Sequence, residues 1–313
     1  MPWNLREANV MGMNERNIKF ISRYNDRKKF PLVDNKLLTK KLALASGIQT
    51  PNLIGIIERQ SQVSTIHQLI EAHQGFVIKP AQGSGGKGIL VIERHHDGLF
   101  TKPSGSVIDS EAIERHISNG LAGLFSLGGR SDVIFIEGLV KADPMFEKLS
   151  FEGVPDIRII VFKGYPVMAM IRLSTHESDG KANLHQGAVG VGLNLRNGTA
   201  IHGVQFNRPI KNHPDTRELL NDITIPHWDE MLQLACRCYE MTGLGYLGVD
   251  MILDRDQGPL LLELNARPGL AIQIANGKGL KSRLKRVEAE QRPFYFPSVE
   301  ERIRFAKQHL CYL

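Results

Sequence analysis

The sequence predicts an α+β protein in which strands and helices are mixed without a regular βαβ rhythm. Three further observations indicate a soluble globular chain. The 313 residues are 42% hydrophobic and 23% charged, which is ordinary for a globular chain with a real core. No internal repeat is present, and no apolar run approaches the roughly 18 residues that cross a bilayer. The N-terminus also lacks the apolar core of a secretory signal, so we expect a cytoplasmic protein without a transmembrane segment.

The charge balance favours anionic ligands. The formal net charge is +6 and the isoelectric point is about 9.2. The basic residues are scattered and aromatic residues are sparse, so no nucleic acid is expected as a partner. Cys236 and Cys238 are two apart in a helical pattern and would point to different faces, so we expect buried or incidental thiols and neither a disulfide nor a zinc site between them.

The first half of the chain alternates helices and strands. Residues 1–33 read as a polar arm with one or two helical turns, followed by a helix that Asp34 caps and Gly47 ends. The elements expected next are a strand at 52–58, a helix at 63–75, a strand at 76–80, a glycine-rich loop at 81–88, a strand at 89–93 and a helix at 109–125.

The second half is richer in strands. The expected elements are a strand at 133–140, two strands within 155–174, a glycine-rich polar stretch at 175–194, a helix at 227–243 and a hairpin at 248–270. The last residues, 276–313, are basic and partly helical. A basic helix of this kind suits either a membrane surface, an acidic partner or a solvated face.

The loop at 81–88 contains Gly83, Gly85 and Gly88 in the spacing G-x-G-x-x-G. A dinucleotide fold requires a helix after this loop, but a β-rich run follows. A Walker A loop requires Ser or Thr after Lys87, where Gly88 stands, and the kinase elements H-R-D and D-F-G are missing. The loop is therefore either a hairpin whose N–H groups cover phosphates or a mobile surface turn. Lys79, a charge inside the preceding apolar strand, favours phosphate binding because it needs a partner.

The hairpin at 248–270 places acidic groups together. With a four-residue loop from Arg255 to Gly258, Met251 would pair with Leu262 and Asp250 with Glu263, while Asn265 follows on the same face. Two opposed carboxylates repel, so a cation is expected between them. Carboxylate and amide oxygens suit Mg²⁺. The alternative is an exposed face with solvated acids, which the apolar run around Glu263 disfavours.

Taken in order, the motifs Asp156-Ile-Arg158, Asn183-Leu-His-Gln-Gly, Gly-Val-Asp250 and Glu263-Leu-Asn265-Ala-Arg-Pro-Gly resemble those of the ATP-grasp superfamily. Within it, the chain is most similar to the RimK-type α-L-glutamate ligases. The resemblance covers residues 34–275 and implies an ATP-grasp fold of two α+β subdomains, 34–138 and 139–275, that grip ATP between them. Residues 1–33 would form an N-terminal arm and 276–313 a basic C-terminal tail.

The resemblance also implies roles for individual residues. Lys36 and Lys79 would hold the nucleotide phosphates, and the loop would cover them. Arg158, Arg172 and Lys79 would act on the reacting groups as catalytic residues, with a structural ion-pair role as the alternative for Arg158. The nucleotide-binding residues would be Lys36, Lys79, Gly83, Ser84, Gly85, Gly86, Glu137, Gly138, Asp156 and Asn183, with the backbone at Glu137 and Gly138 reading adenine. Asp250, Glu263 and Asn265 would be the Mg²⁺ ligands, with Mn²⁺ as a substitute. Arg267 would either hold a substrate anion or brace its own turn.

The function implied is an ATP-dependent carboxylate–amine ligase that works through an acyl phosphate. It would add glutamate or another amino acid to a peptide, protein or envelope-precursor acceptor. The alternative is a phosphotransferase or a nucleotide-sensing protein on the same scaffold. RimK-type ligases carry a further N-terminal domain, whereas only 33 residues precede Asp34 here. The chain thus resembles a short form in which the arm, the tail or a partner protein completes the acceptor side, and a homo-oligomer is among the expected assemblies.

Overall fold

The computed structural model describes residues 8–83, 85–126, 128–146, 148–151, 153–290 and 294–313. The chain divides into two compact units. The small unit contains residues 34–41 and 50–141, and the large unit contains the described parts of 1–33, 42–49 and 142–313. Both terminal segments, expected as an arm and a tail, therefore belong to the large unit.

The small unit is built on two antiparallel sheets. Four strands follow the order β1-β7-β2-β3, and three more follow the order β4-β5-β6. The elements are β1 (Leu53–Ile57), η3 (Gln60–Thr65), α5 (Ile66–Ile70), β2 (Phe76–Pro80), β3 (Leu90–Ile92), β4 (Arg94–His96), β5 (Leu99–Thr101), β6 (Val107–Asp109), α6 (Ser110–Leu121) and β7 (Ile134–Gly138). The glycine-rich loop joins β2 to β3, as the sequence predicts.

The helix expected at 34–47 begins later than predicted. A short helix, α3 (Pro31–Asp34), ends at Asp34, and α4 (Lys36–Ala45) starts after it. The carboxamide of Asn35 accepts a hydrogen bond from the backbone N–H of Leu38 (2.9 Å), so Asn35 caps the helix and the predicted cap at Asp34 is wrong. Gly47 ends the helical segment with φ +65°, as expected.

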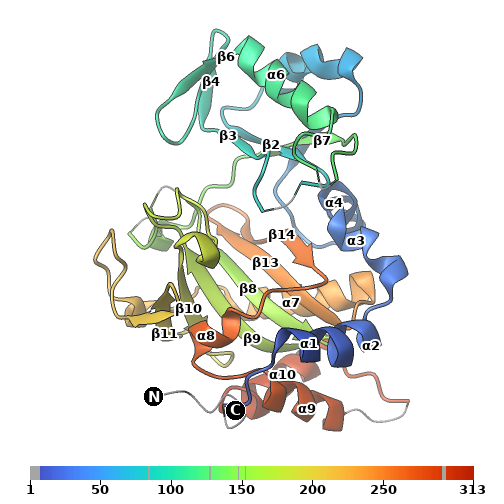
Figure 1. Ribbon diagram of the computed structural model, residues 1–313, viewed down its shortest axis with the longest axis vertical. Coiled ribbons are helices and arrows are strands. Elements are labelled where there is room, and N and C mark those ends of the chain that lie inside the picture. The colour runs from blue at the N-terminus through green and yellow to red at the C-terminus, as the bar shows by residue number, and fades with distance from the viewer. Residues whose placement is uncertain (1–7, 84, 127, 147, 152, 291–293) are drawn as a thin grey trace. The chain divides into compact units, whose positions relative to one another are not determined.

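The large unit contains a seven-stranded antiparallel sheet with the order β12-β11-β10-β9-β8-β13-β14 (Figure 1). Its strands are β8 (Asp156–Phe162), β9 (Tyr165–Leu173), β10 (Val189–Leu193), β11 (Ala200–Gln205), β12 (Arg208–Ile210), β13 (Tyr246–Asp254) and β14 (Gly258–Asn265). Its helical elements are α1 (Met13–Glu15), η1 (Arg16–Ile21), α2 (Ser22–Tyr24), η2 (Arg27–Lys29), η4 (Pro144–Phe146), η5 (Leu184–Gln186), η6 (Leu220–Asp222), α7 (Trp228–Thr242), α8 (Ile272–Asn276), α9 (Lys281–Glu290) and α10 (Val299–His309).

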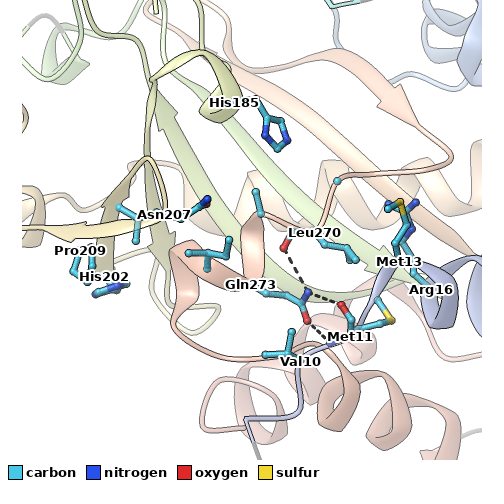
Figure 2. Close-up of a pocket in the computed structure, with 14 residues that line it drawn as sticks. Val10, Met11, Met13, Arg16, His185, His202, Asn207, Pro209, Leu270 and Gln273 are labelled. Atoms are coloured by element: carbon cyan, nitrogen blue, oxygen red, sulfur yellow. Dashed lines mark hydrogen bonds between the residues drawn. The ribbon is translucent and has the colours of Figure 1, made fainter. Parts of the chain in front are cut away.

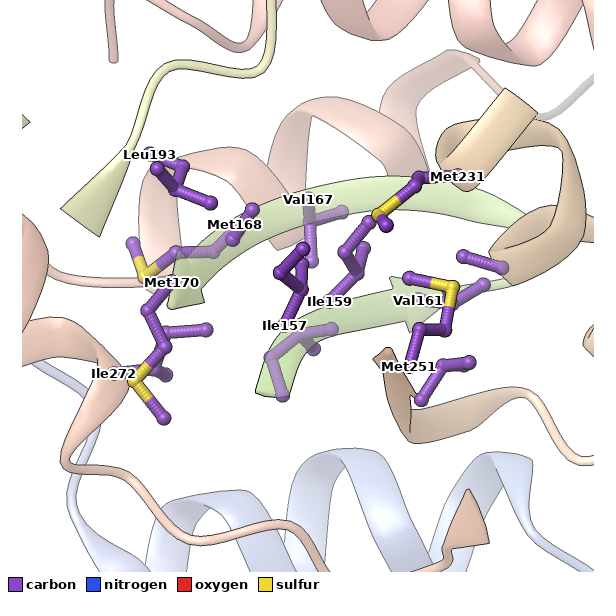
Figure 3. Packing of buried hydrophobic residues seen from close by; sticks show 14 of the residues in the cluster. Ile157, Ile159, Val161, Val167, Met168, Met170, Leu193, Met231, Met251 and Ile272 are labelled. Atoms are coloured by element: carbon purple, nitrogen blue, oxygen red, sulfur yellow. The ribbon is translucent and has the colours of Figure 1, made fainter. Parts of the chain in front are cut away.

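Both faces of this sheet are covered. Helix α7 packs on β8, β9, β13 and β14 and also contacts α10, whereas α8 packs on β9, β10 and β11. The core joins strand and helix residues in one cluster, in which Ile157, Ile159 and Val161 of β8 lie near Met231 of α7 and Met251 of β13 (Figure 3). Burial of these side chains is the main force that holds the sheet to its helices.

The terminal segments contribute to the same core. Phe20 and Ile21 near the N-terminus, Leu284 in α9 and Ile303 in α10 are all buried in this cluster. The basic face of α9 therefore belongs to a helix that is packed against the sheet by its apolar side. In the part of the chain that the structure describes, no helix is both long and apolar enough to cross a membrane.

Candidate active site

One face of the large sheet carries a row of charged side chains. Along β8, Ile157 and Ile159 are fully buried in the core, and the alternation of a strand places Asp156 and Arg158 on the opposite face. The motif Asp-Ile-Arg thus places two charged side chains on one face of the sheet and a core isoleucine on the other. The neighbouring strands add charges to that face, because Arg172 of β9 pairs in register with Asp156 and Asp250 of β13 pairs with Arg158.

Arg158 and Asp250 form a two-bonded ion pair across β8 and β13. Arg158 donates from Nε to one carboxylate oxygen (2.6 Å) and from Nη2 to the other (2.5 Å). The side chains are only 12% and 7% exposed. Two parallel charge-assisted bonds in such a buried place hold both groups in one geometry.

Arg172 links this pair to a third carboxylate. It donates from Nε and Nη2 to the two oxygens of Asp156, and its Nη2 also lies 3.1 Å from Asp250. Asp156, Arg158, Arg172 and Asp250 therefore form one continuous network, which we call the charged cluster. Arg158 and Arg172 are thus two cations in contact with Asp250, while the metal ion that the sequence predicts between Asp250 and Glu263 stays a prediction.

The two carboxylates of the cluster differ in their affinity for protons. Burial is the largest influence on each and opposes ionisation, but at Asp250 the guanidinium groups of Arg158 and Arg172 outweigh it and lower the pKa to about 2. At Asp156, burial and then the nearby Asp250 carboxylate prevail over Arg172 and raise the pKa to about 6. Burial also disfavours the charge on Arg172, but Asp156 and Asp250 prevail and raise its pKa. One member of the cluster thus takes up a proton near pH 6.

The hairpin places Glu263 opposite Asp250, as the sequence predicts, but part of the predicted register is wrong. Asp250 pairs with Glu263, and Gly248 pairs with Asn265. The register then shifts by one residue, so that Met251 pairs with Leu261 instead of Leu262. A β-bulge on one strand produces this shift and lets both the acidic end and the loop end of the hairpin keep apolar residues buried. The same shift pairs Ile252 with Leu260 and Leu253 with Pro259.

The residues at this end of the hairpin fit a magnesium site by their chemistry. Among the described residues, no three His, Cys, Asp or Glu side chains gather around one point. The available donors are two carboxylates and the amide oxygen of Asn265, which also accepts from the N–H of Arg267 (3.0 Å). Carboxylate and amide oxygens are hard donors of the kind that suits Mg²⁺.

Close packing explains why the motif Gly-Val-Asp begins with glycine. A Cβ on Gly248 would lie 2.7 Å from the side chain of Pro268, so only glycine lets the Asn-Ala-Arg-Pro-Gly turn approach β13 this closely. The exposed Arg267 in this turn lies over the ring of Phe30, with 5.2 Å between its guanidinium carbon and the ring centre. That contact is consistent with the bracing role considered for Arg267.

In the small unit, Glu137 forms a second buried cluster with two lysines. Lys79 donates to one of its carboxylate oxygens, and Lys40 lies 2.7 Å from the other. Lys40 also donates to the hydroxyl of Thr50 (3.0 Å). Burial disfavours the charge of Glu137, but Lys79 and Lys40 outweigh it and lower its pKa. Burial also lowers the pKa of Lys40.

Lys40 was missed by the sequence analysis, although a signal existed. It lies three residues after Leu37 and three before Ala43, and both of these are buried. Helical spacing therefore places Lys40 on the inner face of α4, where a charge requires a partner. Lys79 meets the same requirement through Glu137, so its position inside an apolar strand is explained without a phosphate.

The backbone of Glu137 and Gly138 lies inside the small sheet. Strand β7 pairs with β1 on one side and β2 on the other, and the N–H of Gly138 donates to the carbonyl of Asn52 (2.8 Å). This donor is already used, so adenine recognition by the N–H of Gly138 does not fit the structure. The N–H groups of β7 are used in this way because β7 is a central strand, which has no open edge.

The glycine-rich loop contains residues with left-handed backbone, and Lys36 contacts it. Gly85 has φ +63° and Gly86 has φ +77°, and a Cβ at either would meet nothing within 4 Å. Lys36 donates from Nζ to the carbonyl of Gly83 (2.8 Å). Its ammonium group therefore lies at the loop. Ser84, another predicted phosphate contact, lies outside the described residues.

Asn183 begins the short helix η5. Its side-chain oxygen accepts from the N–H of His185 (3.0 Å), so it acts as the N-cap, a local role that the sequence did not suggest. The motif Asn-Leu-His-Gln-Gly ends at Gly187, whose φ of +104° stops the helix. Leu184 in this turn packs over Gly190 of β10, the register partner of Arg172.

Comparison with known proteins agrees with the fold and the motifs. A family model described as sugar-transfer associated ATP-grasp matches residues 15–289. The protein is therefore of the ATP-grasp class, with the α+β fold that the sequence predicted. More particularly, the chain belongs to the sugar-transfer associated ATP-grasp family. The superfamily prediction is confirmed, whereas the RimK-type assignment stays a prediction. No match is found among curated protein sequences.

Several solved structures are similar to this chain. The ATP-grasp ligase PsnB complexed with precursor peptide PsnA2 and AMPPNP has 16% identity and a TM-score of 0.47, over 85% of this chain and 61% of that one. D-alanyl-alanine synthetase A from Vibrio cholerae has 11% identity and a TM-score of 0.49, over 92% and 67%. D-alanine–D-alanine ligase from Bacillus anthracis complexed with ATP has 15% identity and a TM-score of 0.46, over 91% and 71%. The chain spans about 60% of the length of the PsnB chains that it matches.

Proposed function

We propose that this protein is an ATP-dependent carboxylate–amine ligase. The observation that carries the proposal is the charged cluster with Glu263 opposite Asp250, found at the family's motifs in an ATP-grasp chain. Two guanidinium groups beside three carboxylates can receive anionic substrates and a cation in the same place. No side-chain nucleophile is needed for this chemistry.

The proposed reaction has two steps. A substrate carboxylate oxygen attacks the γ-phosphorus of ATP, and the bond from that phosphorus to the β–γ bridging oxygen breaks, which gives an acyl phosphate and ADP. An amine nitrogen then attacks the acyl carbon, the carbon–oxygen bond to phosphate breaks, and the nitrogen loses a proton. The products are an amide, ADP and phosphate.

In the large unit, Arg172 and Arg158 would offset negative charge on the transferred group and on the substrate carboxylate. Both are held in place by carboxylates, which fixes their direction before substrate binds. Asp250, Glu263 and Asn265 would hold Mg²⁺, which when bound would neutralise charge on phosphate oxygens. Asp156, with its raised pKa, would hold a proton or release it as the charge nearby changes.

In the small unit, Lys36 and the loop that it contacts would bind the nucleotide phosphates. The Nζ of Lys36 lies at Gly83, and the open space around Gly85 and Gly86 leaves their backbone accessible to a phosphate. Lys79 would turn from Glu137 toward a phosphate when nucleotide binds, while Lys40 stays with Glu137.

The description of the family guides the choice of substrates. Because the family is sugar-transfer associated, we propose that one substrate is an amino sugar, a uronic acid or a precursor that carries one. Glutamate and other amino acids, with peptide acceptors, remain part of the proposal. The RimK-like reaction is thereby one case of the same chemistry.

The test is release of ADP and phosphate from Mg-ATP across pairs of amino acids, short peptides, amino sugars and uronic acids. Mass spectrometry of the products accompanies it. Release that depends on one carboxylate and one amine, with a new amide mass, is the expected result. A stable phosphorylated product would identify a phosphotransferase instead. ATP binding without release for any pair would favour nucleotide sensing and overturn the ligase.

A further inference from the structure

The large unit contains a pocket of about 770 Å³ that the proposed reaction does not yet use (Figure 2). Four segments form its walls: residues 10–16, the turn at His185, residues 202–209 and residues 269–274. Most of the lining is apolar. The apolar lining residues are Val10, Met11, Met13, Val204, Pro209, Leu270, Ala271 and Ile274.

The wall formed by residues 10–16 is firmly attached. The buried Gln273 accepts from the N–H of Met11 (2.8 Å) and donates to the carbonyl of Met11 (3.0 Å), as Figure 2 shows. The same side-chain oxygen accepts from the N–H of Leu280 (3.0 Å). These bonds make the N-terminal segment a fixed part of the pocket, so its shape exists before a ligand arrives.

The pocket wall also contains a buried guanidinium that no carboxylate among the described residues neutralises. Arg16 is 8% exposed. Its Nη1 donates to the carbonyl of Pro268 (2.6 Å), and its Nε and Nη2 donate to the side chain of Asn17. Both partners are neutral, and within the described part of the chain no carboxylate pairs with Arg16. Three of its five N–H donors are thus used, which leaves one on each terminal nitrogen.

A charge in such a place is costly unless an anion completes it. Burial lowers the pKa of Arg16, and the nearby Arg267 adds to that effect. A ligand anion would supply a counter-charge to Arg16, and a carboxylate matches the two remaining donors.

The pocket lies on the sheet face that carries the charged cluster. Gly190 of β10 is the register partner of Arg172, and a Cβ there would meet Leu184 at 2.7 Å and Ala275 at 3.5 Å. Leu184 precedes the pocket residue His185, and Ala275 follows the pocket residue Ile274. Both elements therefore cover the face from which Arg172 projects.

We propose that this pocket binds an amphipathic carboxylic acid, with its apolar body among the methionine and aliphatic side chains and its carboxylate on Arg16. We further infer that this acid is a substrate, a step that rests on the proposed ligase function. The binding itself does not, because all of its walls belong to the large unit and none of them is a predicted nucleotide or metal ligand.

The experiment compares octanoate with octanamide by calorimetry on the full chain without nucleotide. The two probes share their apolar body and differ in charge. We expect saturable octanoate binding and at least tenfold weaker binding of octanamide. Arg16→Met should lower octanoate affinity at least tenfold, and Arg16→Lys should restore part of it. The fluorescence of the buried Trp228 checks that each variant keeps its fold.

A second pair of variants tests the pocket without touching Arg16. Ile274→Trp should block the pocket and abolish octanoate binding. Ile201→Trp is the matched control, because Ile201 is 42% exposed against 41% for Ile274 but does not line the pocket. Equal affinity for the two probes, no saturable binding of octanoate, or equal effects of the two tryptophan variants would overturn the proposal. Specific octanoate binding without any ADP release would leave this site standing and refute only the ligase.

Discussion

Arg158 and Asp250 stand directly opposite each other on β8 and β13, and the guanidinium binds both oxygens of the carboxylate. This relationship decides how the cluster behaves. Asp250 shares Arg172 with Asp156, so a change at any of the four side chains alters the balance of charge at the other three.

The first prediction concerns the stability of this pair. Arg158→Met should lower the free energy of unfolding of the large unit by about 3–5 kcal/mol, because it leaves Asp250 buried with Arg172 alone. Asp250→Asn should destabilise less than that, and the double variant should lose less than the sum of the two single losses. Urea unfolding followed by the fluorescence of Trp228 measures all four proteins. Additive losses would show that the two side chains are not coupled.

The second prediction concerns pH. The folded-state pKa of Asp156 is raised to about 6, so below that pH the folded chain holds a proton that the unfolded chain releases near pH 4. Its contribution therefore favours folding at pH 4 and is lost as the pH rises toward 6. In Asp156→Asn this loss should disappear, so the melting temperature of the variant should fall less than that of the unmodified protein between pH 4 and 6. An unchanged slope in the variant would assign the proton to another group.

The contribution of Asp250 to stability depends on pH in the opposite direction. Its folded-state pKa is lowered to about 2, so its contribution to stability is present above pH 4 and is lost as the pH falls toward 2. The two carboxylates of one cluster thus act in adjacent pH windows, which lets melting curves separate them.

The third prediction concerns the small unit. Lys40→Met should leave Glu137 with Lys79 alone and weaken the sheet by about 1–3 kcal/mol, because the carboxylate oxygen that Lys40 contacts stays buried and loses its partner. Hydrogen exchange at the amides of β2 and β7 should then become faster. Lys41→Met is the matched control, because Lys41 follows Lys40 on α4 and its side chain is exposed. Equal exchange in both variants would mean that Lys40 contributes nothing to the cluster.

The fourth prediction concerns the metal. Glu263→Gln should reduce magnesium-dependent turnover at least 100-fold while the melting temperature stays nearly constant, because the amide removes a charge from a half-buried position without changing its size. Glu288→Gln, which keeps a hydrogen-bond acceptor for Tyr24, is the control outside the cluster. Steady-state kinetics at varied Mg²⁺ make the measurement. Full activity of the Glu263 variant would remove this residue from the ligand set.

Local pattern was enough for several features of this protein. The alternation of charge and apolar side chains in Asp-Ile-Arg and in the hairpin predicts strands, and the positions of Asp250 and Glu263 follow from a short turn. Gly47 and Gly243 end helices where the sequence places them, each with positive φ. The order of the motifs was specific enough to identify the superfamily that the family model then confirmed.

Other features depend on which strands become neighbours. The sequence does not predict that Arg172 contacts both Asp156 and Asp250, because these contacts require β9, β8 and β13 to lie side by side in the sheet. The bulge after Asp250 is likewise decided by packing on both faces of the hairpin, which overrides the simplest register.

By itself, the sequence determined the fold class, the two acidic hairpin residues and the glycine-rich loop, because each depends on spacing within a short stretch of chain. The tertiary structure alone decided that arginines offset Asp250, that Lys40 joins Lys79 on Glu137, and that the N-terminal segment closes a pocket around Arg16. Charges removed from water must find partners, and only the folded chain determines which distant residues come within reach of one another.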